Sequence, residues 1–474
     1  MLNIDDYRSI EKAIRFFEEF SKIPHGSGNT SMIADYLVDF AKKRNLDCTR
    51  DSADNVIIRK AATKGYEDRP AVIFQGHLDM VAEKKPDADI DMEKDGLTLY
   101  RDGDFLRAEN TTLGGDDGVA LAYALAVLDS DDIPHPDFEA VFTSDEEIGL
   151  LGAVAINPDE IKGRLLINID SDEEGVFTVG CAGGMRSDIT LPVRRTNSSN
   201  CSYKVKVSGF KGGHSGVEID KGRVNANKAL VEIISKIGDI SIKDIRGGNA
   251  DNAIPRECEC VFSSSYNHIA LIKKLGEEMK AKYSDIEPDI CVEAEKIENA
   301  NAGVCVEDSM RLISLLDKLP SGIIAMCSDV EGLVETSLNM GILKLTQNTA
   351  EISFSVRSAK GSEKKALGDR LEEIAREHGA KYGTRGEYPA WEYKKDSHLR
   401  DVMKKVYEDM YGESPEIVII HAGLECGIFS EKLEGVDCVS IGPNNYDIHT
   451  TEERLSISSF ARVWDFLLNV LKEI

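Results

Sequence analysis

The chain has 474 residues, of which 42% are hydrophobic and 30% are charged, and its formal net charge is −27. This composition excludes a disordered chain and predicts a globular protein of two or three domains. The strongly acidic balance argues against nucleic acid or an anionic membrane surface as the main partner.

Three features of the sequence bear on the cellular compartment and on contact with a membrane. Residues 1–8 lack a basic segment followed by an apolar one, so they do not resemble a signal peptide. The ten cysteines include no Cys-x-x-Cys pair, which is typical of thiols in a reducing compartment. The longest apolar stretch, 119–128, is about half the length of a membrane span. We therefore expect a cytoplasmic protein without a membrane partner.

Helical and strand-like segments alternate through the first part of the chain. Helices are predicted at 9–20, 30–43 and 118–128, and strands at 56–58, 71–74, 140–142 and 165–169. Such alternation predicts an α/β domain with a mostly parallel sheet. Ligand sites in these sheets lie beyond the carboxyl ends of the strands.

The pattern changes near residue 186 to that of an α+β block. In this block strands are predicted at 203–207, 257–262, 290–294, 341–345 and 350–356, and helices at 225–237, 268–283, 308–319 and 363–377. After residue 386 the first pattern returns, with two strands and an amphipathic closing helix. We therefore predict one domain, formed by 1–186 and 387–474, that is interrupted by a second domain at 187–386.

A pair of adjacent carboxylates follows the predicted strand 140–142. Glu146 and Glu147 lie where the chain must turn, with Gly149 directly behind them. Neighbouring side chains at a strand end point in different directions. One carboxylate can then bind a cation while the other moves a proton, as metal-assisted hydrolysis requires.

Other predicted strands also end at side chains that can bind a metal. His77 and Asp79 follow strand 71–74, and Asp170 ends the apolar run 165–169. A carboxylate at the end of a buried strand is costly unless it meets a cation or hydrogen-bond donors. The glycine-rich segment that opens helix 118–128 adds Asp116 and Asp117, either of which could instead be a helix N-cap.

Together these residues form an oxygen-rich set with imidazole at its ends. Such a set suits two Zn²⁺, Mn²⁺ or Co²⁺ ions bridged by a carboxylate, and is poor for copper or iron–sulfur chemistry. A late histidine would complete the set. The residues alone leave open whether it is His449 or His421, because both follow a predicted strand.

Five motifs in order resemble those of the di-zinc exopeptidases, a family that includes carnosinases, aminoacylases and bacterial carboxypeptidases. The motifs are His77-Leu78-Asp79, Leu113-Gly114-Gly115-Asp116-Asp117-Gly118, Thr143-Ser144-Asp145-Glu146-Glu147-Ile148-Gly149, Asn168-Ile169-Asp170 and His449-Thr450-Thr451-Glu452. Segments 21–25, 247–257 and 421–427 are most similar to the dipeptidase branch of this family, which has a large inserted lid.

The resemblance implies a role for each residue of the site. Asp116 would bridge two divalent cations, most simply Zn²⁺, with His77 and Asp170 completing one site and Glu147 and His449 the other. Asp79 would orient His77, and Glu146 would be the general base.

In the inserted block, the resemblance implies that His214 reaches over the site and that Asn252 and Arg357 hold the substrate. The guanidinium of Arg357 suits a carboxylate, because its planar fork can bind both oxygens. His421 lies after this block, in the segment 387–474, and is either a substrate contact or a core histidine. The block could also support a homodimer.

The resemblance further implies hydrolysis of dipeptides with an unblocked amino terminus, including Xaa-His dipeptides. Two alternatives remain at this point. One is an amidohydrolase that removes acyl groups from amino acids on the same fold. The other is a metal-free binding protein, which predicts the loss of Glu146 or of a ligand, and none is missing.

Overall fold

The computed structural model describes residues 7–197, 201–298, 302–327 and 332–474. Residues 1–6, on which the prediction about a signal peptide largely rests, lie outside this part. The structure divides into two compact units. The first unit comprises Met1–Gly180, Tyr393–Ile419 and Leu424–Ile474, and the second comprises Cys181–Glu392 and Ile420–Gly423. A catalytic role for the first unit and a lid role for the second stay predictions.

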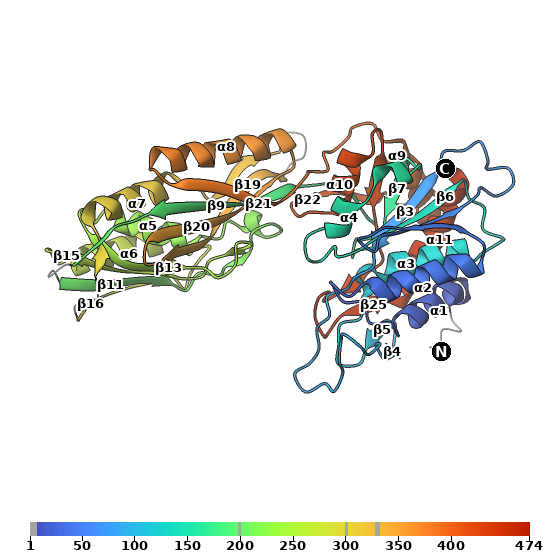
Figure 1. Cartoon of the computed structure of the whole chain (residues 1–474), viewed down its shortest axis with the longest axis horizontal. Coiled ribbons are helices and arrows are strands. Elements are labelled where there is room, and N and C mark those ends of the chain that lie inside the picture. Colours follow the sequence, from blue (N-terminus) through green and yellow to red (C-terminus); the bar gives the residue numbers. More distant parts are fainter. Residues whose placement is uncertain (1–6, 198–200, 299–301, 328–331) are drawn as a thin grey trace. The chain divides into compact units, whose positions relative to one another are not determined.

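An eight-stranded mixed sheet forms the centre of the first unit (Figure 1). Its strands, in spatial order, are β1 (Asp47–Arg50), β2 (Val56–Lys60), β6 (Phe138–Thr143), β3 (Val72–His77), β7 (Leu165–Asn168), β23 (Asp437–Ser440), β8 (Val176–Cys181) and β22 (Glu416–Ile420). The four central strands β6, β3, β7 and β23 are parallel. The pairs β1–β2, β2–β6 and β23–β8 are antiparallel, so the sheet is mixed.

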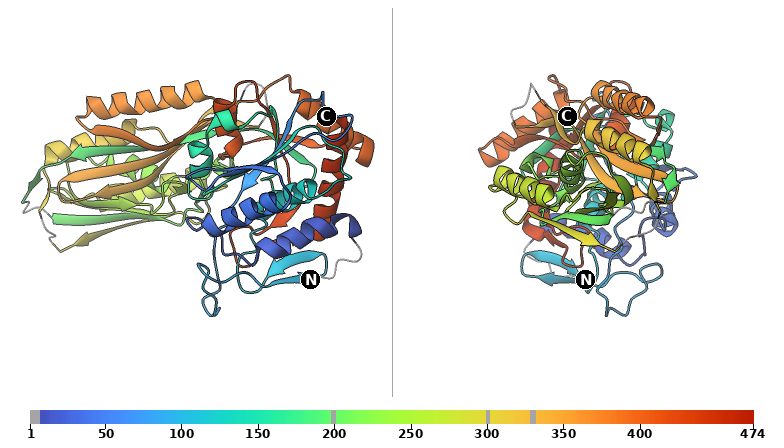
Figure 2. Two further views of the ribbon diagram at one scale, coloured as in Figure 1. Left: turned by 45° about the vertical axis from the view of Figure 1, so that its right-hand side comes forward. Right: turned by 90° about the vertical axis from the view of Figure 1, so that its left-hand side faces the viewer.

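Helices pack against this sheet, and most of them share a hydrophobic core with it. They are α1 (Glu11–Phe20), α2 (Ser31–Lys43), α3 (Gly115–Leu128), α4 (Leu151–Ala155), α9 (His398–Tyr411), α10 (Glu425–Lys432) and α11 (Ile457–Glu473), with short 3-10 turns at Arg8–Ile10 and Pro158–Glu160. Helix α3 is apolar and buried on nearly every side, as expected for a helix enclosed in a core. It packs on β3 and against α1, which Figures 1 and 2 show beside it.

A small antiparallel sheet flanks this core within the first unit. Its strands, in spatial order, are β24 (Asn445–Tyr446), β25 (Arg454–Ser456), β5 (Phe105–Ala108) and β4 (Leu99–Asp102). Strand β25 leads directly into α11, so the segment that carries His449 is held at both ends by regular structure.

The second unit is built on a nine-stranded antiparallel sheet. Its strands, in spatial order, are β16 (Cys291–Ile297), β11 (Cys201–Ser208), β15 (Cys258–Ser264), β13 (Ser241–Gly247), β19 (Val334–Leu345), β20 (Thr349–Ser358), β9 (Gly183–Pro192) and β21 (Lys381–Tyr388), and β18 (Gly322–Met326) pairs with β19. Strands β9, β11 and β20 alternate between buried and more exposed residues, the pattern of a sheet with one covered face.

Four helices pack along this sheet (Figure 1). They are α5 (Ala226–Ile234), α6 (Ile269–Tyr283), α7 (Val306–Lys318) and α8 (Gly361–Glu377). Two minor ribbons, β10 (Arg195–Thr196) with β17 (Gly303–Val304) and β12 (Gly213–His214) with β14 (Ala253–Ile254), and the 3-10 turn Ile219–Lys221 complete the unit. The unit has its own core, which the buried faces of these helices and strands form.

Two further findings bear on the predicted setting of the protein. None of the helices in the described ranges is both long and apolar enough to cross a membrane. None of the ten cysteines, all of which the structure describes, is in a disulfide bond.

Candidate metal centre

The predicted ligands of the first unit come from the carboxyl ends of neighbouring parallel strands. His77 is the last residue of β3, Asp170 lies two residues beyond β7, and Glu146 and Glu147 lie in the turn after β6. Because these three strands are adjacent and parallel, their ends meet at one edge of the sheet. Asp116 joins them from the first turn of α3, which packs on β3.

Asp116 lies between two histidines and contacts each with a different carboxylate oxygen. Its Oδ1 is 2.9 Å from His77 Nε2, and its Oδ2 is 3.1 Å from His449 Nε2. His77 Nε2 also lies 3.6 Å from Asp170 Oδ1, and His449 Nε2 lies 2.8 Å from Glu147 Oε1. Asp116 is thus shared by two groups, each with one histidine and one further carboxylate.

The ligand atoms in each group are close enough to hold a cation. The atoms of His77, Asp116 and Asp170 lie within 4.8 Å of one another, and so do those of Asp116, Glu147 and His449. Glu147 Oε1 is buried, and its close contact with His449 Nε2 does not have the geometry of a hydrogen bond. An orphaned carboxylate oxygen beside imidazole nitrogens fits a divalent cation of the Zn²⁺ or Mn²⁺ type.

The charges in the cluster also favour the binding of divalent cations. The neighbouring carboxylates of Asp116 and Glu147 stabilise the protonated imidazole and raise the pKa of His449 to about 10. Burial would lower the pKa of His77, but its hydrogen bonds to the carboxylates of Asp116, Asp170 and Asp79 raise it well above its usual value. Excess carboxylate charge therefore holds protons on both imidazoles, and divalent cations can replace those protons.

Glu146 lies beside this cluster, and its carboxylate binds a proton more tightly than an exposed glutamate does. Burial raises the pKa of Glu146 well above the usual glutamate value, and the nearby negative charge of Asp170 adds to this while His77 opposes it. A general base works best when its pKa lies near the operating pH. The environment of Glu146 moves its pKa in that direction.

Asp79 contacts both the histidine and the turn that carries the two glutamates. Its Oδ1 accepts a hydrogen bond from the backbone N–H of Glu146 at 2.9 Å, and its Oδ2 accepts one from Ser27 Oγ at 2.7 Å. His77 Nδ1 lies 2.9 Å from the backbone oxygen of Asp79 and 3.6 Å from its carboxylate. The nearer orienting contact to His77 is thus the main-chain carbonyl, while the carboxylate holds the glutamate turn.

Two buried carboxylates near the cluster are not among the predicted site residues. Glu425 is fully buried and accepts hydrogen bonds from Gln75 Nε2 at 2.5 Å and Thr143 Oγ1 at 2.6 Å. Glu453 is 3% exposed and contacts the loop that leads to Asp116. Neither has a sequence signal of its own, because burial of an acidic side chain is decided by distant segments.

The second unit brings two of the three predicted lid residues, His214 and Arg357, together around Gly216, and His421 from the predicted segment 387–474 joins them. A side chain at Gly216 would lie 2.9 Å from His214 Cε1, 3.1 Å from Arg357 Nε and 2.7 Å from the backbone oxygen of His421. Glycine is therefore required at Gly216 for this close approach. Asn252, the third predicted lid residue, accepts a hydrogen bond at its backbone oxygen from the N–H of Ser215.

This group in the second unit is cationic and partly unpartnered. Arg357 is 6% exposed and donates to Tyr388 Oη at 2.9 Å, but its Nε lacks a partner among the described residues. Burial, followed by the charge of Arg357, lowers the pKa of His214 and lowers that of His421 to about 4. His421 Nε2 lies 2.7 Å from Ser337 Oγ, so this histidine is packed inside the second unit.

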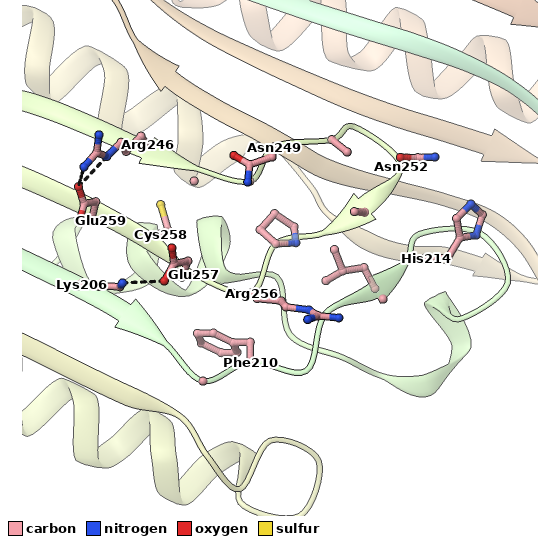
Figure 3. Close-up of a pocket in the computed structure, with 18 residues that line it drawn as sticks. Lys206, Phe210, His214, Arg246, Asn249, Asn252, Arg256, Glu257, Cys258 and Glu259 are labelled. Carbon is pink, nitrogen blue, oxygen red and sulfur yellow. Dashed lines mark hydrogen bonds and ion pairs between the residues drawn. The ribbon is translucent and has the colours of Figure 1, made fainter. Parts of the chain in front are cut away.

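A groove of about 1250 Å³ lies in the second unit beside these residues (Figure 3). His214 and Asn252 lie at one end, and two ion pairs, Lys206 with Glu257 and Arg246 with Glu259, lie at the other. The groove is thus lined by His214, which was predicted to reach over the site, and by Asn252, one of the three predicted substrate contacts.

Comparisons with known proteins identify the family of this chain. The model of peptidase family M20/M25/M40 matches residues 73–473. The chain is 36% identical over 467 residues to the cytosol non-specific dipeptidase of Escherichia coli (strain K12), and the match covers 97% of this chain and 96% of that protein. The chain belongs to peptidase family M20/M25/M40.

Solved structures agree with this membership. The aminoacylhistidine dipeptidase of Vibrio alginolyticus is 35% identical, with a TM-score of 0.91 and coverage of 98% of this chain and 96% of that one. Aminopeptidase PepT from Bacillus cereus, with 17% identity, a TM-score of 0.57 and 98% coverage of both chains, shows a likeness of fold alone. The predicted α/β class and the resemblance to a metallopeptidase family are confirmed, and this M20 peptidase is a metal-dependent hydrolase.

Proposed function

We propose that this M20 peptidase hydrolyses dipeptides with an unblocked amino terminus, Xaa-His dipeptides among them, using two divalent cations and Glu146 as the general base. The names of the Escherichia coli and Vibrio alginolyticus relatives support the substrate class. The observation that carries the proposal is the position of Asp116, whose two carboxylate oxygens lie 2.9 and 3.1 Å from the Nε2 atoms of His77 and His449.

The residues of the cluster would have two roles, cation binding and proton transfer. His77, Asp116, Asp170, Glu147 and His449 would hold the cations. Bound there, two divalent cations supply Lewis acidity towards the scissile carbonyl and towards an attacking water molecule. Glu146 would accept the proton of that water at its carboxylate and return it to the leaving amine. Its raised pKa suits both transfers, since a stronger base accepts the proton and a weak acid still delivers it.

The second unit would supply substrate contacts. The Arg357 guanidinium has an unpartnered Nε, which suits a substrate carboxylate or a developing oxyanion. Because the pKa of His214 is lowered by burial and by Arg357, this imidazole is neutral near pH 7 and can donate one N–H. These roles for His214, Arg357 and Asn252 rest on the family resemblance. His421, packed on Ser337, would position its neighbours rather than bind substrate.

A substrate panel tests the proposed activity. The metal-free protein would be reconstituted separately with Zn²⁺, Mn²⁺ and Co²⁺ and given Ala-His, Gly-Leu, N-acetyl-Ala-His and N-acetyl-methionine. We expect cleavage of the two unblocked dipeptides and at least about a hundredfold lower rate on the blocked compounds. If acetate were released from the blocked compounds faster than amino acids are released from the dipeptides, the protein would be a deacylase and the proposal would be overturned.

Metal analysis tests the number and identity of the cations. We expect two equivalents per chain in the active protein, with zinc retained after dialysis. One equivalent at full activity would contradict the bridging role of Asp116. A homodimer formed through residues 187–386 and a cytoplasmic location stay predictions, and sedimentation analysis of the whole chain tests the first.

A further inference from the structure

The loop that carries Asp116 is held by a single buried carboxylate. Glu453 Oε2 accepts hydrogen bonds from the backbone N–H groups of Leu113 at 2.7 Å and Gly114 at 3.1 Å. Its Oε1 accepts from the backbone N–H of Gly115 at 2.8 Å and faces that of Asp116 at 3.5 Å. Four consecutive main-chain donors therefore converge on one side chain.

The glycines of this loop are explained by that contact. A Cβ at Gly115 would lie 3.1 Å from Glu453 Oε1 and 2.7 Å from Asn445 Nδ2, so a larger residue would push the carboxylate away. Gly114 has a φ of 69°, in the left-handed region that favours glycine. The Gly114-Gly115 pair thus lets the chain curl around the carboxylate immediately before Asp116.

Glu453 also belongs to the segment that carries the second histidine. Its backbone N–H donates to the backbone oxygen of Thr450, which closes a turn directly after His449. Asn445 Nδ2 donates to Glu453 Oε1 at 3.2 Å from the other side of that turn. One side chain therefore links the loop of Asp116 to the turn of His449, the two residues whose side chains meet at 3.1 Å.

We infer that Glu453 is a positioning residue of the metal centre, which sets the distance between the bridging carboxylate Asp116 and the ligand His449. The inference rests on the metal centre of the proposed function. A carboxylate is required, because an amide has one oxygen and would turn its NH₂ group towards backbone N–H donors. Groups that orient metal ligands in this way typically change metal affinity about 10- to 100-fold when they are mutated.

The test compares Glu453→Gln with the matched control Glu452→Gln. Glu452 is the adjacent residue, is exposed and forms an ion pair with Lys85 at the surface. Zn²⁺ alone would be titrated into each metal-free protein by calorimetry, and thermal unfolding of the metal-free proteins would be recorded in parallel. We expect Glu453→Gln to raise the Kd for Zn²⁺ at least about tenfold, with Glu452→Gln within twofold of the wild type.

Kinetics separate a positioning role from a general loss of structure. We expect a lower rate of dipeptide hydrolysis by Glu453→Gln that rises again with added Zn²⁺, while KM for the dipeptide changes less than twofold. If Glu453→Gln does not fold, Asn445→Ala removes one donor to the same carboxylate and should raise the Kd severalfold. Unchanged Zn²⁺ affinity in the folded Glu453→Gln, or in Asn445→Ala as its substitute, overturns the inference. Wild-type protein that binds Zn²⁺ but cleaves no dipeptide would overturn the proposed function alone.

Discussion

The carboxylate of Asp79 accepts a hydrogen bond from the backbone N–H of Glu146, with 2.9 Å between Oδ1 and the nitrogen. A second oxygen of the same carboxylate lies 3.3 Å from the backbone nitrogen of Glu147. The side chain of Asp79, two residues beyond β3, thereby holds the turn after β6 through its backbone N–H groups. That turn carries both the proposed general base and a proposed ligand.

Replacement of Asp79 should therefore disturb the proton carrier as well as the histidine. In Asp79→Asn the amide cannot accept from both backbone N–H groups and Ser27 at once. We expect kcat to fall about 10- to 100-fold, the range typical of lost orienting groups. Steady-state kinetics would measure this, with Ser27→Ala as a control that removes only one donor and should change kcat less than threefold. Equal losses in the two variants would contradict the role given to the carboxylate.

Glu146→Gln removes the proton carrier while leaving the ligand cluster in place. We expect metal content equal to that of the wild type and at least about a 10²-fold lower kcat, the scale of a lost general base. Metal analysis and kinetics on the same preparation check both parts. Near-normal turnover would refute the assignment of Glu146.

Removal of the cations should destabilise the first unit. Without them, burial and the negative charge of Asp116 raise the pKa of Asp170 to about 7, which shows that the ionised carboxylate is unfavourable at this position in the absence of a cation. A ligand present at 100 times its Kd stabilises the folded state by about 2.7 kcal/mol. We therefore expect a chelator to lower Tm by several degrees and an excess of Zn²⁺ to restore it. A Tm that does not respond to chelation would argue against a metal centre here.

His421 makes the second unit sensitive to acid. Burial and the charge of Arg357 lower its pKa to about 4 in the folded protein, against 6.5 when unfolded. The unfolded chain therefore binds the proton more tightly, and stability is full above about pH 6.5 and is lost as the pH falls towards 4. The difference of about 2.5 pKa units between the folded and unfolded states corresponds to about 3 kcal/mol in the free energy of unfolding.

Denaturant unfolding between pH 4 and pH 7 measures this effect. We expect His421→Gln, whose amide can keep the contact with Ser337, to flatten the pH dependence of the free energy of unfolding. His398→Gln, at an exposed position at the start of α9, serves as the control and should leave the dependence as it is in the wild type. An unchanged slope in His421→Gln would show that the buried histidine does not carry the effect.

Local patterns were sufficient for the central elements of the first unit. The apolar runs that form β3, β6 and β7 and the apolar helix α3 are all buried, so their composition identifies them without knowledge of their partners. Helix α9 was missed although its signal is present. Ser397 caps it, and Leu399, Met403 and Val406 recur at helical spacing on its buried face.

Other elements carry no such local signal. Strand β21 (Lys381–Tyr388) is mostly exposed and contains Gly383 and Gly386, and it is a strand because it pairs with β9. The hairpin of β4 and β5 is likewise short and only partly buried. Edge strands of this kind depend on a neighbour for their hydrogen bonds, so composition alone does not identify them.

The sequence by itself determined which kinds of side chain follow the central strands, and hence the chemistry that the chain can support, because each strand and its terminal residue are contiguous. Only the tertiary structure decided which histidine lies against Asp116. His449 lies 3.1 Å from it, whereas His421 belongs to the second unit. The tertiary structure alone also revealed Glu453, 337 residues beyond Asp116 in the chain, because a contact between segments so far apart depends on how the whole unit packs.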